Sequence, residues 1–183
     1  MPRNVFEKEG RVWLTDHLAD SMECGRGNLG GEMPVFVYRL FQFTLRDLLV
    51  DEEGEERAAE LYRKAGFRAG EYLAEHMLEL DRPIGTFVAR LQSLLVELKI
   101  GVMRVEEFDD ATGRMVITVA EDLDCSGLPM LGMTVCTYDE GFLAGILSRY
   151  TRKTYEVREI DCWASGGRVC RFEAKVSKVR GAP

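Results

Sequence analysis

Four cysteines gathered in one C-terminal stretch constrain this chain more than any other feature of its sequence. They are Cys125, Cys136, Cys162 and Cys170, and an acidic run occupies residues 156–161 of the same stretch. Zinc prefers thiolate ligands in a tetrahedral arrangement. The stretch therefore predicts a metal site on which the domain closes. Since no C-x-x-C pair is present, buried free thiols that pack as small hydrophobes and a redox pair stay open as alternatives.

The bulk properties narrow the class of protein. A net charge of −7 argues against non-specific binding to nucleic acid or to anionic membranes, which needs basic patches. The sequence has no apolar run of about 18 residues and no apolar segment typical of a signal peptide, so we expect neither a membrane span nor export. We therefore expect a cytoplasmic protein, in which clustered cysteines are more typical of metal or redox sites than of disulfides.

The N-terminal part of the chain predicts an arm followed by helices. Residues 1–33 have mixed character: residues 12–14 could form a short strand or a plug, and the glycines of residues 25–30 indicate a loop, not a dinucleotide fingerprint. Apolar periodicity predicts three helices, beginning at Pro34, near Glu55 and after Asp81, the last with Asp81 as its cap. Gly66 and Gly70 on the second helix would let another helix approach closely.

After Lys99 the pattern changes to that of strands. Residues 100–108 and 114–121 predict one hairpin, and residues 153–161 and 168–176 predict a second. A helix carrying Gly141 and Gly145 is expected between the hairpins. We therefore predict an α+β fold, with N-terminal helices and one central helix packed on an antiparallel sheet made of two hairpins. The predicted domain covers residues 34–183.

The residues themselves favour three metal ligands. Cys162 and Cys170 flank the turn of the second hairpin, so antiparallel strands would bring them close together. Cys136 begins the helix between the hairpins, where the helix dipole stabilises a thiolate. Glu159 could reach the same point if its strand bends, and Cys125 is the alternative fourth ligand.

Several motifs make this sequence similar to the 4-vinyl-reductase (4VR) domain family. The resemblance runs from about Val37 to Val176, and its motifs are YRKAGFRAG, DCSGLP, YDEGFLAGIL and EIDCWASGGRVCRFEA. The family shares its fold with nitric-oxide sensors and with subunits of a vesicle-tethering complex, and it includes sensory domains of bacterial regulators that respond to aromatic compounds. In those sensors three cysteines and one glutamate hold a structural zinc. The resemblance thus implies zinc on Cys136, Glu159, Cys162 and Cys170, with Cys125 set aside.

The same resemblance implies a ligand pocket between the third helix and the sheet. The family's histidine and tryptophan positions fall here on Phe87 and Met115, which implies a more apolar ligand. Phe87, Leu91, Met115 and Ile117 are the predicted ligand-binding residues, and a plain hydrophobic core is the alternative interpretation of the same stripe.

Three functions follow as hypotheses. The first is a domain that binds or senses a small hydrophobic molecule, stabilised by zinc and working as a homodimer. The second is a non-catalytic dimeric scaffold of the same fold, and the third is an enzyme of tetrapyrrole metabolism, as the family's name suggests. The sequence gives little support to an enzyme, because it has no credible nicotinamide or flavin fingerprint, and neither His17 nor His76 neighbours a plausible nucleophile.

Overall fold

The computed structural model describes residues 14–18 and 25–177. The chain divides into two compact units, Met1–Pro34 and Val35–Pro183, each described by itself. In the first unit, the described residues form the short helix η1 (Leu14–His17) and the glycine-containing turns of residues 25–30. Residues 12 and 13 of the expected strand or plug lie outside the described residues. The predicted boundary between an arm and a domain stays a prediction.

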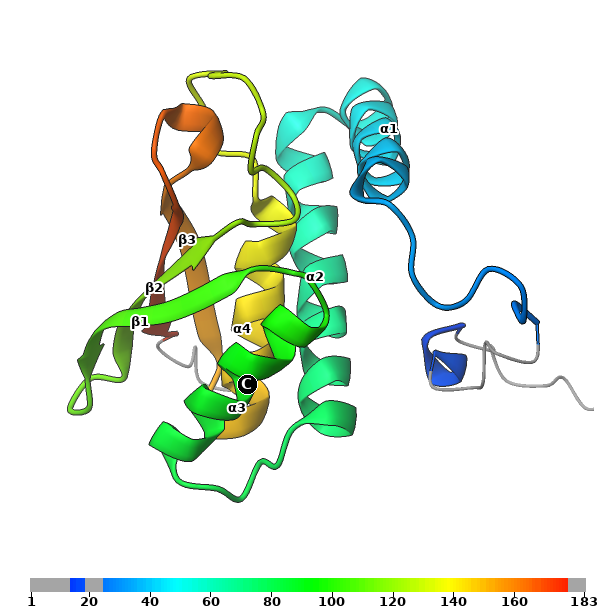
Figure 1. Cartoon of the computed structure of the whole chain (residues 1–183). Coiled ribbons are helices and arrows are strands. Elements are labelled where there is room, and N and C mark those ends of the chain that lie inside the picture. The colour runs from blue at the N-terminus through cyan, green and yellow to red at the C-terminus, as the bar shows by residue number, and fades with distance from the viewer. Residues whose placement is uncertain (1–13, 19–24, 178–183) are drawn as a thin grey trace, which may run out of the picture. The chain divides into compact units, whose positions relative to one another are not determined.

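The second unit is built on one antiparallel sheet of four strands (Figure 1). The strands are β1 (Val102–Asp109), β2 (Arg114–Ala120), β3 (Tyr155–Asp161) and β4 (Cys170–Val176). The two hairpins, β1–β2 and β3–β4, join through β2 and β4, which gives the spatial order β1-β2-β4-β3. The predicted α+β fold with two hairpins is confirmed.

Four helices accompany the sheet: α1 (Val35–Glu53), α2 (Glu55–Met77), α3 (Ile84–Glu97) and α4 (Thr137–Thr151). Helix α4 lies between α2 and the sheet, in contact with β3 (Figure 1). Their bounds correct one detail, since Pro83 and not Asp81 is the N-cap residue of α3, and it makes no side-chain cap hydrogen bond. Among the described residues, no helix combines the length and the apolar character that crossing a membrane would need.

Glycines on facing helices explain why α2 and α4 pack backbone against backbone. A Cβ on Gly66 or Gly70 would lie about 2 Å from a carbonyl oxygen of α4, and one on Gly141 or Gly145 equally close to α2. Such distances are far below van der Waals contact, so only glycine fits at these four positions. The close packing predicted from the glycine spacing is confirmed.

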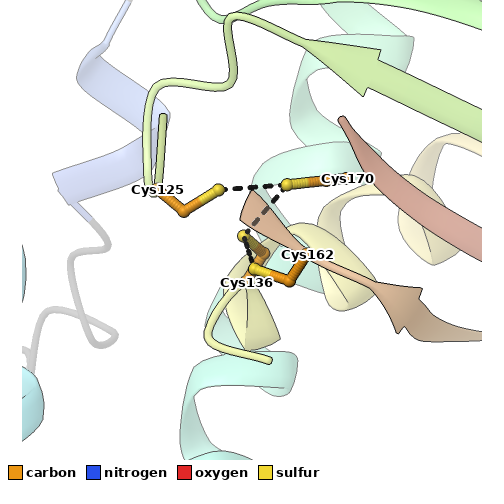
Figure 2. Close-up of side chains that lie close together, drawn as sticks. All are labelled: Cys125, Cys136, Cys162 and Cys170. Carbon is orange, nitrogen blue, oxygen red and sulfur yellow. Dashed lines mark hydrogen bonds between the residues drawn. The ribbon is translucent and has the colours of Figure 1, made fainter. Parts of the chain in front are cut away.

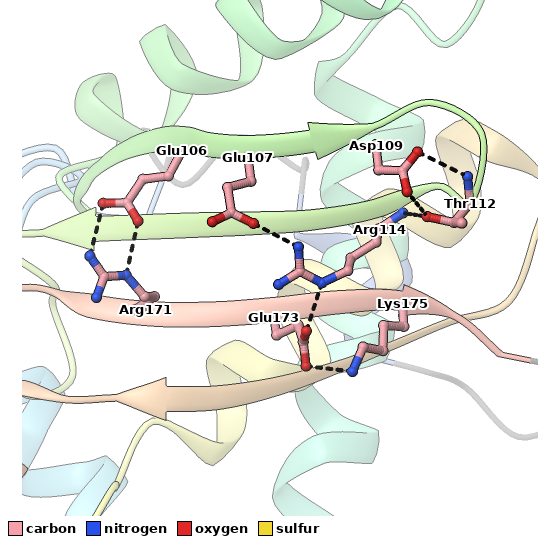
Figure 3. A network of polar contacts seen from close by, with 8 residues as sticks. All are labelled: Glu106, Glu107, Asp109, Thr112, Arg114, Arg171, Glu173 and Lys175. Carbon is pink, nitrogen blue, oxygen red and sulfur yellow. Dashed lines mark hydrogen bonds and ion pairs between the residues drawn. The ribbon is translucent and has the colours of Figure 1, made fainter.

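The face of the sheet that carries charged side chains is crossed by ion pairs (Figure 3). Arg171 on β4 donates to both carboxylate oxygens of Glu106, at 2.9 and 3.1 Å. Arg114 on β2 donates to Glu107 and to Glu173, each at 2.7 Å. The long stems of these side chains lie beside Val116 and Thr118 of β2, which are buried.

Helix α1 differs from the other helices in its environment. No residue of Val35–Glu53 is buried, although the sequence of the helix is strongly apolar. Its exposed apolar side chains are Val35, Phe36, Val37, Leu40, Phe41, Leu45 and Leu48. Contacts with α2 and hydrogen bonds to the loop after β2 therefore hold this helix in place.

Candidate metal centre

The fold brings the four cysteines of the C-terminal stretch into one buried cluster (Figure 2). Their four Sγ atoms all lie within 4.8 Å of one another. The Sγ–Sγ distances are 3.0 Å for Cys125–Cys170, 3.7 Å for Cys136–Cys170 and 3.9 Å for Cys136–Cys162. All four thiols are free of disulfides. The cluster offers four thiol ligand atoms around one point.

Four different elements supply these side chains. Cys125 lies in the loop after β2, Cys136 is the N-cap of α4, Cys162 follows β3, and Cys170 begins β4. The turn of η3 (Trp163–Ser165) returns the chain from Cys162 toward β4, helped by a capping box between Cys162 and Ser165. A domain that joins these elements depends on the cluster as a crosslink between distant parts of the chain.

Two carboxylates fix the backbone that carries the thiols. Asp122 Oδ1 accepts the N–H groups of Asp124 at 2.8 Å and Cys125 at 3.0 Å, which shapes the loop after β2. Glu159 Oε2 accepts the N–H of Cys136 at 3.0 Å, which places a negative charge at the N-terminus of α4. Both carboxylates act here on the backbone of a cysteine.

The predicted ligand Glu159 thus lies beside the cluster, in contact with the backbone of Cys136. The group whose ligand atoms converge contains Cys125, the alternative fourth ligand, in addition to Cys136, Cys162 and Cys170. A second group of converging atoms joins Cys136 to Asp122 and Asp139. The ligand set that the family resemblance implies stays a prediction, and the geometry makes four cysteines an equally complete set.

The electrostatics of the site follow from burial of many acidic groups in one place. Hydrogen bonds from the other three thiols lower the pKa of Cys162, whereas a hydrogen bond with Cys125 is the first cause of the raised pKa of Cys136 and of Cys170. Burial raises the pKa of Glu159 to about 8 and, with the charge of Asp122, that of Asp124 to about 6. The surroundings therefore disfavour a further negative charge.

Helix α1 is attached to the same loop by polar side chains. Tyr38 donates to Asp124 Oδ1 at 2.8 Å and Gln42 Nε2 donates to Asp124 Oδ2 at 2.7 Å. Arg39 donates to the carbonyl oxygens of Leu123 and Ser126, at 2.8 and 2.9 Å. The loop that carries Cys125 is thus held both by Asp122 and by α1.

The predicted ligand-binding residues lie elsewhere, in the hydrophobic core. Phe87, Leu91, Met115 and Ile117 are each 2% exposed and belong to one core cluster. The ring of Phe87 stacks on Tyr150, with 3.8 Å between the ring centroids. Their packing accords with the core interpretation of this stripe, and their role in ligand binding stays a prediction.

Two cavities that sequence reasoning missed adjoin α1. One, of about 410 Å³, is lined by residues of α1 and α2 and by Tyr138. The other, of about 270 Å³, lies between α1 and the loop of residues 124–135. Gln42 and Tyr62 line both. The only sequence signal for them was the apolar character of α1, which we expected to be largely buried; none of its residues is.

Comparison with known proteins supports the resemblance. The family model of the vinyl-4-reductase (4VR) domain matches residues 115–176, which contain all four clustered cysteines. An uncharacterised protein of Methanocaldococcus jannaschii is 31% identical over 86 residues, which cover 47% of this chain and 51% of that protein. The match thus spans about half the length of this relative.

Solved structures share the fold over most of the chain. The phenol-responsive sensory domain of the transcription activator PoxR, solved with phenol, is 21% identical, with a TM-score of 0.60 over 79% of this chain and 75% of that one. Subunit 3 of a trafficking protein particle complex from Naegleria fowleri, covalently bound to palmitic acid, is 11% identical, with a TM-score of 0.59 over 79% of this chain and 95% of that one. The predicted resemblance to the 4VR family and to the tethering-subunit fold is confirmed.

Proposed function

We propose that residues 35–176 form a domain that senses a small hydrophobic molecule, and that a structural zinc ion held by the four clustered cysteines stabilises it. The observation that carries the zinc proposal is the convergence of four buried Sγ atoms from four separate elements. A reducing, cytoplasmic location, in which thiols stay available to a metal, belongs to the same proposal.

The donor set fits zinc. A tetrahedral site with Zn–S bonds of about 2.3 Å has sulfur atoms roughly 3.8 Å apart. The distances of 3.7 Å for Cys136–Cys170 and 3.9 Å for Cys136–Cys162 lie close to this value. Four thiolates fill the coordination sphere of zinc and leave no position for a catalytic water, so the ion would have a structural role. Asp122 and Glu159 would orient the ligands through the backbone.

The ligand proposal draws on the class of protein. The fold is that of a sensory domain that responds to phenol and of a subunit covalently bound to palmitic acid, and both molecules have an apolar body and one polar group. This likeness supports the fold, and the class of ligand comes to this chain as our proposal. The cavities beside α1 provide space of the size that small molecules occupy.

Zinc analysis of purified variants tests the metal proposal. Protein purified without added zinc should contain about one zinc ion per chain, and Cys125→Ser should lose it because metal binding is coupled to folding. Glu159→Gln should retain the ion. The matched control is Cys24→Ser, since the proposal gives the fifth cysteine no ligand role. Loss of zinc in Glu159→Gln with retention in Cys125→Ser would replace our set with three cysteines and Glu159.

We further propose that the domain forms a homodimer through α1. The exposed apolar side chains of this helix form an uncovered surface that a second copy of the same surface can cover. Two copies related by a two-fold axis would bury the same side chains on each. A measured mass of one chain at micromolar concentration would contradict this part of the proposal.

A further inference from the structure

The cavity between α1 and α2 has walls of one chemical kind. Its volume is about 410 Å³, within the range of small-molecule sites. Apolar and aromatic side chains make up nearly all of its lining: Tyr38, Phe41, Leu45, Leu49, Leu61, Tyr62, Ala65 and Tyr138. An occupant would therefore need an apolar body, most of which leaves water on binding.

One polar side chain in this lining has an unmet need. Gln42 Oε1 is buried, and no donor among the described residues lies within hydrogen-bond distance of it. The orientation of the amide is fixed, because Gln42 Nε2 donates to the carboxylate of Asp124 at 2.7 Å, a partner that cannot receive the carbonyl oxygen. A buried acceptor without a partner costs free energy that a donor on an occupant would recover.

The remaining polar atoms of the lining offer no competing donor. The hydroxyl of Tyr38 donates to Asp124 at 2.8 Å, and that of Tyr62 donates to the backbone carbonyl of Gln42 at 2.6 Å. Both hydroxyl protons are therefore engaged. The carboxylate of Asp124, behind Gln42 and Tyr38, would repel an anion. The polar side of the cavity favours a neutral donor.

We infer that this cavity binds a neutral apolar molecule with a single hydrogen-bond donor, which Gln42 Oε1 accepts. The inference rests on the proposed function and places its ligand between α1 and α2, away from Phe87 and Met115. Because Gln42 also holds Asp124, the residue before Cys125, an occupant would contact the side chain that joins α1 to the cysteine loop.

Three probes that differ only in their polar group test the chemistry. Binding of 2-naphthol, naphthalene and 2-naphthoate to the full chain would be measured by titration. We expect 2-naphthol to bind about fivefold to tenfold more tightly than naphthalene, the effect of one hydrogen bond to a buried acceptor. Naphthoate should bind more weakly than both. Tighter binding of naphthoate than of naphthol would overturn the inferred chemistry.

Nuclear Overhauser effects from naphthol protons to leucine and isoleucine methyl groups test the position. We expect contacts to Leu45 and Leu61 of the cavity and none to Leu91 or Ile117 of the core. Binding with contacts to Leu91 and Ile117 would keep the proposed function and overturn the site. Failure of all three probes to bind would instead contradict the proposed function for this class of ligand, together with the site.

Two variants complete the test. Ala65→Trp would fill the cavity from α2 and should weaken naphthol binding at least tenfold, whereas Ala89→Trp, at an exposed alanine of α3, should leave it unchanged. Gln42→Met removes the acceptor and should reduce the preference for naphthol over naphthalene to within twofold. That ratio is insensitive to a general loss of stability, so an unchanged preference would overturn the role of Gln42.

A second copy of the chain could occupy the cavity instead of a small molecule. The oligomeric state would therefore be measured in the same samples. If Ala65→Trp disrupts a dimer and naphthol shows no contacts to Leu45 or Leu61, the cavity is part of a protein interface and the inference is wrong.

Discussion

Gln42 on α1 and Asp124 beside the cysteine cluster lie 82 residues apart in the sequence and are joined by a hydrogen bond of 2.7 Å. The contact links a helix that has no buried residue to the loop that supplies Cys125. The position of α1 and the integrity of the cysteine cluster should therefore depend on each other. The reciprocity of coupled equilibria means that a change at either one affects the other.

Arg39 should contribute strongly to the attachment of α1. Its guanidinium donates to two carbonyl oxygens of the cysteine loop, so Arg39→Met leaves Leu123 and Ser126 without these donors. We expect the free energy of unfolding in urea to fall by about 1–3 kcal/mol. Arg57→Met is the control, because Arg57 forms an exposed ion pair with Glu60 worth at most about 1 kcal/mol. Equal losses in the two variants would contradict this account of α1.

The glycines between α2 and α4 should tolerate no side chain. In Gly66→Ala the new Cβ would lie 2.0 Å from the carbonyl oxygen of Tyr138, so the helices must separate. We expect a loss of about 3 kcal/mol or more in stability, as for severe overpacking. Gly85→Ala on α3 is the control, since its Cβ meets nothing within 4 Å, and alanine favours a helix. A Gly66→Ala protein as stable as Gly85→Ala would refute the close packing.

Acidification should release the metal. Protons compete with zinc for the four thiolates, so affinity falls as the pH decreases. With a chromophoric chelator as the indicator, we expect zinc release to increase from pH 7.5 to pH 5 in the wild-type chain. Glu159→Gln should release zinc over the same range of pH if Glu159 contacts only the backbone of Cys136. A clear shift of the release curve in this variant would indicate direct coordination by Glu159.

The exposed face of α1 should determine the oligomeric state. Leu40, 52% exposed, lies on this face, and Leu40→Asp should convert the proposed dimer to single chains in light scattering. Val96 on α3 is 53% exposed and gives a matched control, so Val96→Asp should leave the mass unchanged. Dissociation in both variants, or in neither, would contradict an interface through α1.

The sequence predicted the parts of this fold that depend on local patterns. Alternation of apolar residues identified both hairpins, and the spacing of Gly66, Gly70, Gly141 and Gly145 indicated where helices approach closely. The spacing of the cysteines pointed to a shared site because hairpin strands and a helix start bring such residues together. These signals depend on neighbours in the chain or on one helical period.

Contacts between distant segments were not predictable in the same way. The approach of Cys125 to Cys170 depends on how Asp122 folds the loop after β2, which no repeat or period in the sequence records. The attachment of Arg39 and Gln42 to that loop depends on the angle between α1 and α2. The apolar sequence of α1 suggested a largely buried helix, whereas the structure leaves its apolar side chains on an open face and in the wall of a cavity.

The most direct test of the central proposal is X-ray absorption at the zinc edge of the full chain purified without added metal. Coordination by Cys125, Cys136, Cys162 and Cys170 predicts a single shell of four sulfur atoms at about 2.3 Å. A shell of three sulfur atoms with one oxygen at about 2.0–2.2 Å would contradict the four-cysteine site and favour Glu159. Protein that contains no zinc would contradict the metal centre itself.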